Sequence, residues 1–206
     1  MPEATYLFPE DFLWGTATSS HQVEGGNTNN NWFAWENEPG RIYQGHTAGL
    51  ACDWWGGRWR EDLGNASEDG QNAHRFSIEW SRIQPAPDQW DESALDFYRD
   101  MLRGMSEMGL TPMVTLHHFT DPLWIYEMGG WENDRTPHFF EKFVRYVVPA
   151  LKDDVNLWAT INEPNILAVN SYVEGCFPPG RKDISAAFHA LKNLIRGHAL
   201  AYHAIH

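Results

Sequence analysis

Four short apolar segments, each followed by a helical pattern, constrain the fold of this chain more than any other feature. The segments are Phe12–Ala17, Ala73–Ile78, Thr111–Leu116 and Leu157–Ile161. Short strands that alternate with helices pair in parallel through right-handed crossovers. No linker, internal repeat or low-complexity tract divides the sequence. We therefore predict an α/β protein with one parallel sheet, in a single domain that covers residues 1–206.

Apolar residues recur at helical spacing between the expected strands. Gly109 is placed to end one helix, and Thr136 and Pro137 are placed as the N-cap and first residue of the next. A last helix is expected from about Ser185 to the end. The predicted buried faces are Trp59, Leu63 and Ala66; Leu95, Tyr98, Leu102 and Met105; Phe140, Phe143, Val144, Val147, Val148 and Leu151; and Leu191, Leu194, Ile195, His198 and Tyr202. Two long loops, about residues 24–54 and 120–135, follow strand ends, where long loops are usually functional.

The composition excludes several classes of partner. A net charge of −13 disfavours nucleic acid and anionic membrane surfaces, both of which bind basic patches. The two cysteines, Cys52 and Cys176, lack metal-ligand spacing, so no metal and no cofactor is predicted. Met1–Phe12 lacks the features of a secretory signal and no segment is long enough to cross a bilayer, so a cytoplasmic location is expected. Eleven Trp, eleven Phe and seven Tyr suit an aromatic core or stacking on sugar rings.

Asn162, Glu163 and Pro164 follow the fourth expected strand directly. Pro164 cannot continue a strand ladder, so the strand ends near Glu163. In barrels of alternating strands and helices, chemistry lies at the carboxyl ends of the strands. A carboxyl group that is partly desolvated there has a raised pKa and can act as an acid near neutral pH. The alternative is that the tripeptide is only a polar turn.

Arg75 lies inside an otherwise apolar strand. A buried guanidinium requires an anionic partner. No acid in the chain is an obvious partner, which fits a carboxylate supplied from elsewhere. The alternative is an internal ion pair with Glu24 or Glu79.

Five blocks of sequence resemble glycoside hydrolase family 1, the β-glucosidase family, in the family's order and over essentially the whole chain. The blocks are Phe12–Gly25 (FLWGTATSSHQVEG), His74–Ile83 (HRFSIEWSRI), Thr115–Phe119 (TLHHF), Thr160–Pro164 (TINEP) and Tyr172–Gly180 (YVEGCFPPG). One block is weak evidence, but five in sequence are specific. The resemblance implies that the chain is the N-terminal half, about four β/α units, of a TIM (β/α)₈ barrel. It implies a retaining O-glycoside hydrolase of the β-glucosidase type, which acts in carbohydrate metabolism.

The resemblance also assigns site residues by position. Glu163 corresponds to the catalytic acid/base, and Asn162 to the residue that holds the sugar 2-hydroxyl. Gln22 and His118 correspond to residues that bind hydroxyls at the far side of the same sugar. Arg75 would lie beside the nucleophilic carboxylate. That nucleophile belongs to the family's seventh strand, which this sequence does not contain, so the 206-residue chain alone is expected to be inactive.

The sequence departs from the commonest family pattern at two places. His117-His118-Phe119 stands where the family has Tyr-His-Trp. Phe119 is therefore a substrate-binding candidate, with Phe in place of the family's Trp. Asp53-Trp54 stands where the family has an Asp-His pair. By strand alternation His117 faces away from His118, which favours a structural role for His117.

Other aromatic and histidine residues carry weaker expectations. Trp32, Trp124 and Trp131 are candidate sugar platforms in long loops, with a packing role as the alternative for each. His198, His203 and His206 lack the spacing of a zinc helix motif, which disfavours a metal site.

The expected partners are a β-linked glucoside or related oligosaccharide and the missing C-terminal half-barrel. The helical pattern continues to His206, so the chain is expected to be a piece of a longer barrel. The alternative function is a non-catalytic half-barrel that binds sugar weakly or assembles with a complementary half. A 6-phosphoglycosidase stays open, because that subgroup's phosphate-binding residues also lie in the other half. A thioglucosidase is disfavoured, because those enzymes have Gln where this chain has Glu163.

Overall fold

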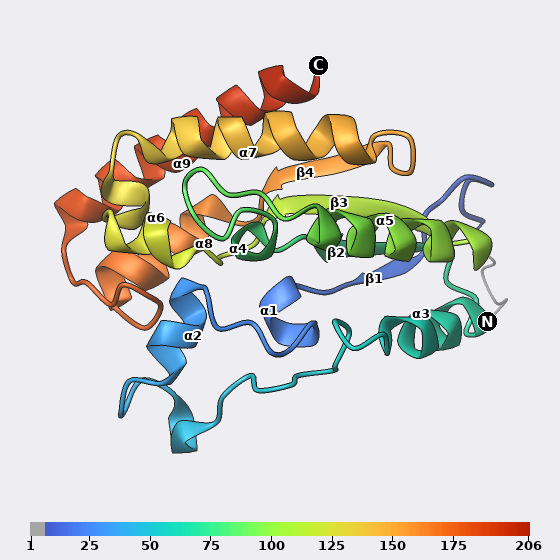
Figure 1. Cartoon of the computed structure of the whole chain (residues 1–206), viewed down its shortest axis with the longest axis horizontal. Coiled ribbons are helices and arrows are strands. Elements are labelled where there is room, and N and C mark those ends of the chain that lie inside the picture. Colours follow the sequence, from blue (N-terminus) through green and yellow to red (C-terminus); the bar gives the residue numbers. More distant parts are fainter. Residues whose placement is uncertain (1–6) are drawn as a thin grey trace, which may run out of the picture.

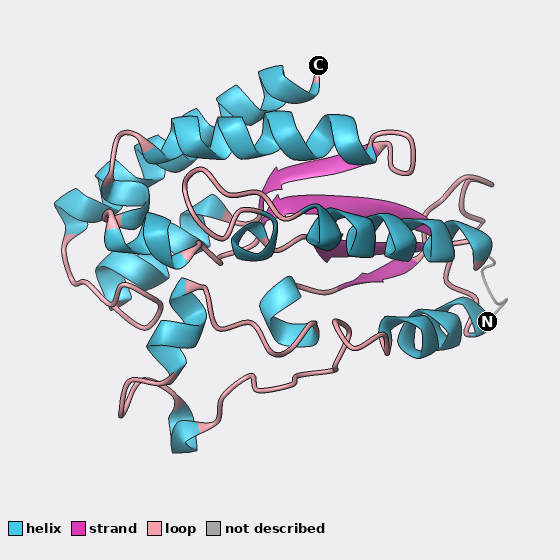
Figure 2. Ribbon diagram, in the orientation of Figure 1, coloured by secondary structure: helices cyan, strands magenta, loops and turns pink. Residues whose placement is uncertain are grey.

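A computed structural model describes residues 7–206, so part of the expectation for Met1–Phe12 lies outside the described residues. The chain forms one parallel sheet with the strand order β1-β2-β3-β4 (Figures 1 and 2). The strands are β1 Gly15–Ala17, β2 Ala73–Ser77, β3 Thr111–His117 and β4 Leu157–Ile161. The predicted α/β class and all four strand positions are confirmed, although β1 is shorter than expected.

Helices separate and flank the strands (Figure 2). The α-helices are α1 Ser20–Val23, α2 Asn31–Glu36, α3 Trp59–Glu68, α4 Trp80–Ile83, α5 Glu92–Glu107, α6 Leu123–Glu127, α7 Thr136–Leu151, α8 Pro164–Val169 and α9 Ile184–Ile205. Short turns of other helix types are η1 Tyr43–Gly45, η2 Gly130–Glu132 and η3 Asn170–Glu174. The two long loops therefore contain short helices of their own: α2 and η1 in the first, α6 and η2 in the second.

Local signals set the ends of the long helices. The Asp91 carboxylate accepts a hydrogen bond from the Ser93 backbone N–H (2.9 Å) at the start of α5, and Gly109, with φ +75°, follows its end as predicted. The Asp183 side chain caps α9 in the same way. Thr136, the predicted N-cap of α7, is its first residue, so the helix begins one residue earlier than predicted.

The hydrophobic core lies around the two central strands, α5 and α7. Phe76 of β2 and Val114 and Leu116 of β3 are buried in it. The predicted faces of α5 and α7 are also buried: Leu95, Tyr98, Leu102 and Met105, and Phe140, Phe143, Val144, Val147, Val148 and Leu151. These expectations are confirmed.

The predicted buried face of α9 is confirmed only in part, because Leu194 is buried and Leu191 packs against the core, whereas the other three predicted residues are exposed. Ile195 and Tyr202 are 56% and 50% exposed. The residues that α9 buries are mostly small: Ala186, Ala187, Ala190, Asn193, Leu194, Gly197 and Ala201. Gly197 shows the reason, because a Cβ atom there would lie 2.9 Å from the Trp131 ring. Close approach to the neighbouring elements, and not hydrophobic content, selects the buried face.

The edge strands are less covered than the two central strands. All three residues of β1 are exposed, and all five residues of β4 are only half-buried. Within residues 7–206 each of these strands has one neighbour in the sheet, so its outer edge is uncovered. In the described part of the chain, none of the helices has the length and apolar character needed to cross a membrane.

Candidate active site

The carboxyl ends of β2, β3 and β4 bring three predicted site residues together. The Arg75 guanidinium donates a hydrogen bond from Nη1 to the Asn162 side-chain oxygen at 3.0 Å. The Asn162 amide nitrogen lies 3.2 Å from Nε2 of His118. The Asn162 backbone N–H donates to the His117 carbonyl oxygen (2.9 Å), which continues the pairing of β3 and β4 one residue past β4. The sheet therefore positions the amide between the guanidinium and the imidazole.

His118 is neutral in this arrangement. Burial, and to a smaller extent the nearby charges of Arg75 and His117, together lower its pKa to about 4. A neutral ring can accept a hydrogen bond at Nε2 from the Asn162 amide. The group thus offers neutral donors and acceptors, as a substrate rich in hydroxyl groups requires.

Arg75 has no carboxylate partner within 4 Å among residues 7–206. The expected alternative, an internal pair with Glu24 or Glu79, is wrong. Glu24 pairs instead with Arg82, whose Nε lies 2.7 Å from its carboxylate, and Glu79 is bonded by hydroxyl groups. Within the described residues, the one hydrogen bond that the half-buried Arg75 guanidinium makes goes to the neutral amide oxygen of Asn162.

Glu163 combines exposure with an unusual backbone conformation. It precedes α8 with φ 41° and ψ 60°, the left-handed region that a residue with a Cβ atom rarely occupies. Its side chain is exposed, so the desolvation expected from the sequence is absent. The reason is that β4 is an edge strand and nothing in residues 7–206 covers the space in front of it. Such backbone strain costs about 1–3 kcal/mol and clusters at functional sites.

Phe119 has the second strained backbone at this end of the sheet, with φ 69°. Its ring lies 4.9 Å from that of His118 and 5.7 Å from that of Phe177. Trp32 donates from Nε1 to the Phe119 carbonyl oxygen (3.2 Å) and its ring lies 4.9 Å from Phe177. Trp32, Phe119 and Phe177 form an aromatic cluster beside His118. Phe177 lies in the Tyr172–Gly180 block that resembles the family, but no sequence pattern identified it as a site residue.

The other two candidate platforms have packing contacts: Trp131 is buried in the core and Trp124 is half-buried against it. Trp131 is 2% exposed and packs edge-on against His117. Trp124 donates from Nε1 to the Gln84 carbonyl oxygen (3.1 Å) and packs against Trp80. The packing alternative describes both residues.

His117 and His118 face opposite ways, as predicted. His117 is buried and its Nε2 lies 3.0 Å from the Asp121 carboxylate, on the side of Trp131. On α9, the Nδ1 of His198 lies 2.7 Å from the Thr160 hydroxyl. Within the described residues no group of three or more His, Cys, Asp or Glu side chains is arranged to hold a metal ion.

Gln22 does not touch the Asn162 group. It lies in the single turn α1, is exposed, and accepts a hydrogen bond from the Ser19 hydroxyl at 2.8 Å. Helix α1, which holds Gln22, follows the carboxyl end of β1 (Figure 1). His118 and Asn162 directly follow the carboxyl ends of the parallel strands β3 and β4, so all three residues belong to the same end of the sheet.

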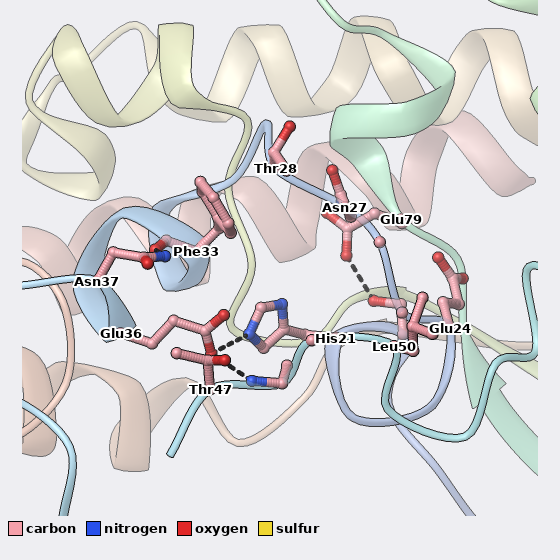
Figure 3. Close-up of a pocket in the computed structure, with 15 residues that line it drawn as sticks. His21, Glu24, Asn27, Thr28, Phe33, Glu36, Asn37, Thr47, Leu50 and Glu79 are labelled. Atoms are coloured by element: carbon pink, nitrogen blue, oxygen red, sulfur yellow. Dashed lines mark hydrogen bonds and ion pairs between the residues drawn. The ribbon is translucent and has the colours of Figure 1, made fainter. Parts of the chain in front are cut away.

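A pocket of about 340 Å³ lies beside α1 (Figure 3). Phe33, Glu36 and Asn37 line the end near α2, and Glu24 and Glu79 line the opposite end. Burial raises the pKa of Glu24 to about 7, opposed by the charge of Arg82. None of Arg75, His118, Asn162 or Glu163 lines this pocket. Sequence reasoning considered Glu24 and Glu79 only as partners for Arg75, although an acid within the apolar run Ile78–Trp80 was a signal of a buried role.

Comparison with known proteins agrees with this geometry. The sequence profile of glycosyl hydrolase family 1 matches residues 4–206. The chain belongs to this family. It is 38% identical over 200 residues to beta-glucosidase A of Thermotoga maritima, covering 94% of this chain and 45% of that protein. It is 34% identical over 206 residues to the human cytosolic beta-glucosidase, covering 96% of this chain and 44% of that protein.

Solved structures of similar proteins show the same architecture. The beta-glucosidase of Thermotoga maritima in complex with glucoimidazole superposes with a TM-score of 0.92 at 37% identity, over 96% of this chain and 46% of that one. The AHE enzyme of Alicyclobacillus herbarius gives a TM-score of 0.94 at 37% identity, over 98% and 47%. This family 1 chain is therefore half of a TIM barrel, and it spans about half the length of the relatives that it matches.

Proposed function

We propose that this chain supplies the acid/base half of a retaining β-glycosidase of the β-glucosidase type. The observation that carries the proposal is the arrangement at the strand ends. Glu163 adjoins Asn162, and Asn162 bridges Arg75 and the neutral His118. Arg75 has no anionic partner within residues 7–206, which suits a site that receives a carboxylate from the rest of the barrel.

The proposed reaction uses two carboxyl groups about 5–5.5 Å apart. A carboxylate from the second half-barrel attacks the anomeric carbon, while Glu163 donates its proton to the departing glycosidic oxygen. Glu163, now ionised, then takes a proton from a water molecule. The water oxygen bonds to the anomeric carbon and releases the carboxylate, so the configuration is retained.

The neighbouring residues bind and orient the sugar in this proposal. Asn162 holds the 2-hydroxyl, and Arg75 keeps the incoming carboxylate ionised through its positive charge. Gln22 and His118 bind hydroxyls at the far side of the ring, and Phe119 offers an apolar face. The substrate class is a β-linked glucoside or related oligosaccharide.

The exposure of Glu163 supports the need for a second half. An acid that must hold a proton near neutral pH requires apolar surroundings, and residues 7–206 leave Glu163 exposed. We therefore propose that the 206-residue chain by itself hydrolyses no glucoside. The alternative of a purely non-catalytic sugar-binding chain is not favoured by the family membership. A cytoplasmic location stays a prediction.

The test is Glu163→Gln in the complete enzyme, that is, this chain together with the C-terminal half of its barrel. Hydrolysis of glucosides with poor leaving groups should fall by on the order of 10²–10⁴-fold, because only those leaving groups need the proton. Activated aryl glucosides should lose much less in their first step, and azide should accelerate their turnover because it attacks without a base.

Glu68→Gln is the matched control, since Glu68 is exposed at the end of α3, and it should leave both rates unchanged. Equal losses on both substrate types in Glu163→Gln would remove Glu163 from the acid/base role.

A further inference from the structure

Glu79 is a fully buried carboxylate that the proposed reaction does not use. It follows β2, occupies the N-cap position of α4 without a capping hydrogen bond from its side chain, and is 0% exposed. Within residues 7–206 no Lys or Arg side chain lies within 4 Å of its carboxylate. A buried charge without a counter-ion is costly unless hydrogen bonds satisfy it. The Glu79 carboxylate must therefore be stabilised by neutral hydrogen-bond donors.

Three hydroxyl groups satisfy Glu79, and they come from three different strand ends. Ser20 of α1, after β1, donates to Oε2 at 2.6 Å. Thr120, after β3, donates to the same oxygen at 3.0 Å. Ser81 of α4, after β2, donates to Oε1 at 2.7 Å. An ionised carboxylate accepts all three bonds, and bonds to a charged group contribute about 1.5–3 kcal/mol each.

The position of Glu79 itself is fixed from the core. Its backbone N–H donates to the Tyr98 hydroxyl oxygen at 2.8 Å, and that hydroxyl donates to Glu24 at 2.6 Å. Burial raises the pKa of Tyr98 well above its ordinary value, so the hydroxyl keeps its proton and stays a donor. Arg82 closes the chain of bonds by pairing with Glu24. Tyr98 of α5 thus fixes the backbone of Glu79, whose carboxylate accepts hydrogen bonds from the three hydroxyl groups.

The hydroxyl groups lie next to the proposed sugar-binding residues. Ser20 precedes Gln22 by two positions in the same helical turn, and Thr120 follows His118 by two positions. Figure 3 shows Glu79 beside Glu24 at one end of the pocket, away from α2. We propose that Glu79 is a positioning residue that fixes the separation of Gln22 and His118 by holding Ser20 and Thr120, and thereby sets the recognition of the sugar's far hydroxyl groups. This inference rests on the proposed function.

The test compares one aryl β-glucoside with its 2-deoxy, 3-deoxy and 4-deoxy analogues in the complete enzyme. Glu79→Gln should lower kcat/KM about tenfold for the parent, the loss of one well-placed hydrogen bond. The 2-deoxy analogue should show the same loss, because Asn162 on β4 has no bond to Glu79. The 3-deoxy and 4-deoxy analogues should lose at most about threefold, because they lack a hydroxyl group that Gln22 and His118 bind.

Two further variants keep the test decisive. Thr120→Val removes one of the three donors with little change of shape and should give the same substrate pattern at smaller size, even if Glu79→Gln fails to fold. Glu107→Gln, at an exposed site at the end of α5, should change no rate. Equal losses on all four substrates in Glu79→Gln and Thr120→Val, or no loss on any, would overturn the positioning role.

The proposed function fails in a different way. If the complete wild-type enzyme does not hydrolyse the parent glucoside, both proposals fall together. If it does, and Glu163→Gln shows the expected leaving-group dependence, uniform losses in the Glu79 and Thr120 variants overturn the positioning role alone.

Discussion

The middle and the edges of the sheet differ in how completely they are packed. Phe76 of β2 and Val114 of β3 are at most 2% exposed, and both strands pair on each side. β1 is exposed and β4 is half-buried, each with a single neighbour in residues 7–206. The same contrast separates Asn162, which is buried and bonded to β2 and β3 residues, from Glu163, which is exposed. The central strands thus position most of the proposed binding side chains. Glu163, the proposed acid, lacks the apolar surroundings that it needs, because residues 7–206 do not supply them.

The largest expected effect concerns activity. The isolated 206-residue chain should hydrolyse no aryl β-glucoside above background and should self-associate, because uncovered strand edges and apolar surface pair with other chains. Adding the C-terminal half-barrel should restore measurable hydrolysis. A glucosidase assay with light scattering on the purified chain checks both statements. A monomer with ordinary turnover that is lost in Glu163→Ala would contradict them.

Amide hydrogen exchange should show the contrast between strands directly. In the isolated chain, diluted until light scattering shows a monomer, amides of β4 should exchange at least about tenfold faster than those of β3, because the outward N–H groups of an edge strand lack partners. Mass spectrometry of peptides that cover residues 111–117 and 157–161 measures this difference. Adding the complementary half should slow exchange in β4 and leave β3 nearly unchanged. Equal rates in the monomer would contradict the prediction, because they would show that β4 is protected without the complementary half.

The smallest expected effect is a change in the pH dependence of stability. The folded protein keeps His118 neutral with a pKa lowered to about 4, whereas the unfolded chain takes up its proton near pH 6.5. Stability from this residue is therefore present above pH 6.5 and is lost as the pH falls towards 4. The slope is at most about 1.4 kcal/mol per pH unit. In the complete enzyme, His118→Asn should reduce this slope in urea unfolding.

Above about pH 7.5 the difference in unfolding free energy between His118→Asn and wild type should not depend on pH, since the histidine is neutral in both states there. Between pH 6.5 and 4 that difference should shrink. A constant difference over the whole range would show that His118 titrates alike in the folded and unfolded chain.

Much of the fold could be predicted because its signals are local. Strand β4 was placed at Leu157–Ile161 from its apolar run and the proline that follows, and α5 was ended at Gly109 from a single residue type. The pairing of strand and helix patterns then implied the parallel sheet. Ile195 and Tyr202 of α9 were wrongly expected to be buried, because hydrophobic periodicity does not report how closely another element approaches, as Gly197 and Trp131 show.

The sequence by itself determined the order of strands and helices, and it marked Arg75 within a strand and Glu163 at a strand end. The half-barrel and the binding roles of His118 and Asn162 were implied by the resemblance to family 1. Only the tertiary structure decided their partners. Arg75 meets Asn162 from 87 positions away, and Ser20 meets Glu79 from 59 positions away. Such contacts depend on how strand ends come side by side in the sheet. For the same reason the exposure of Glu163 follows from what covers β4, which no feature of the residues around it can specify.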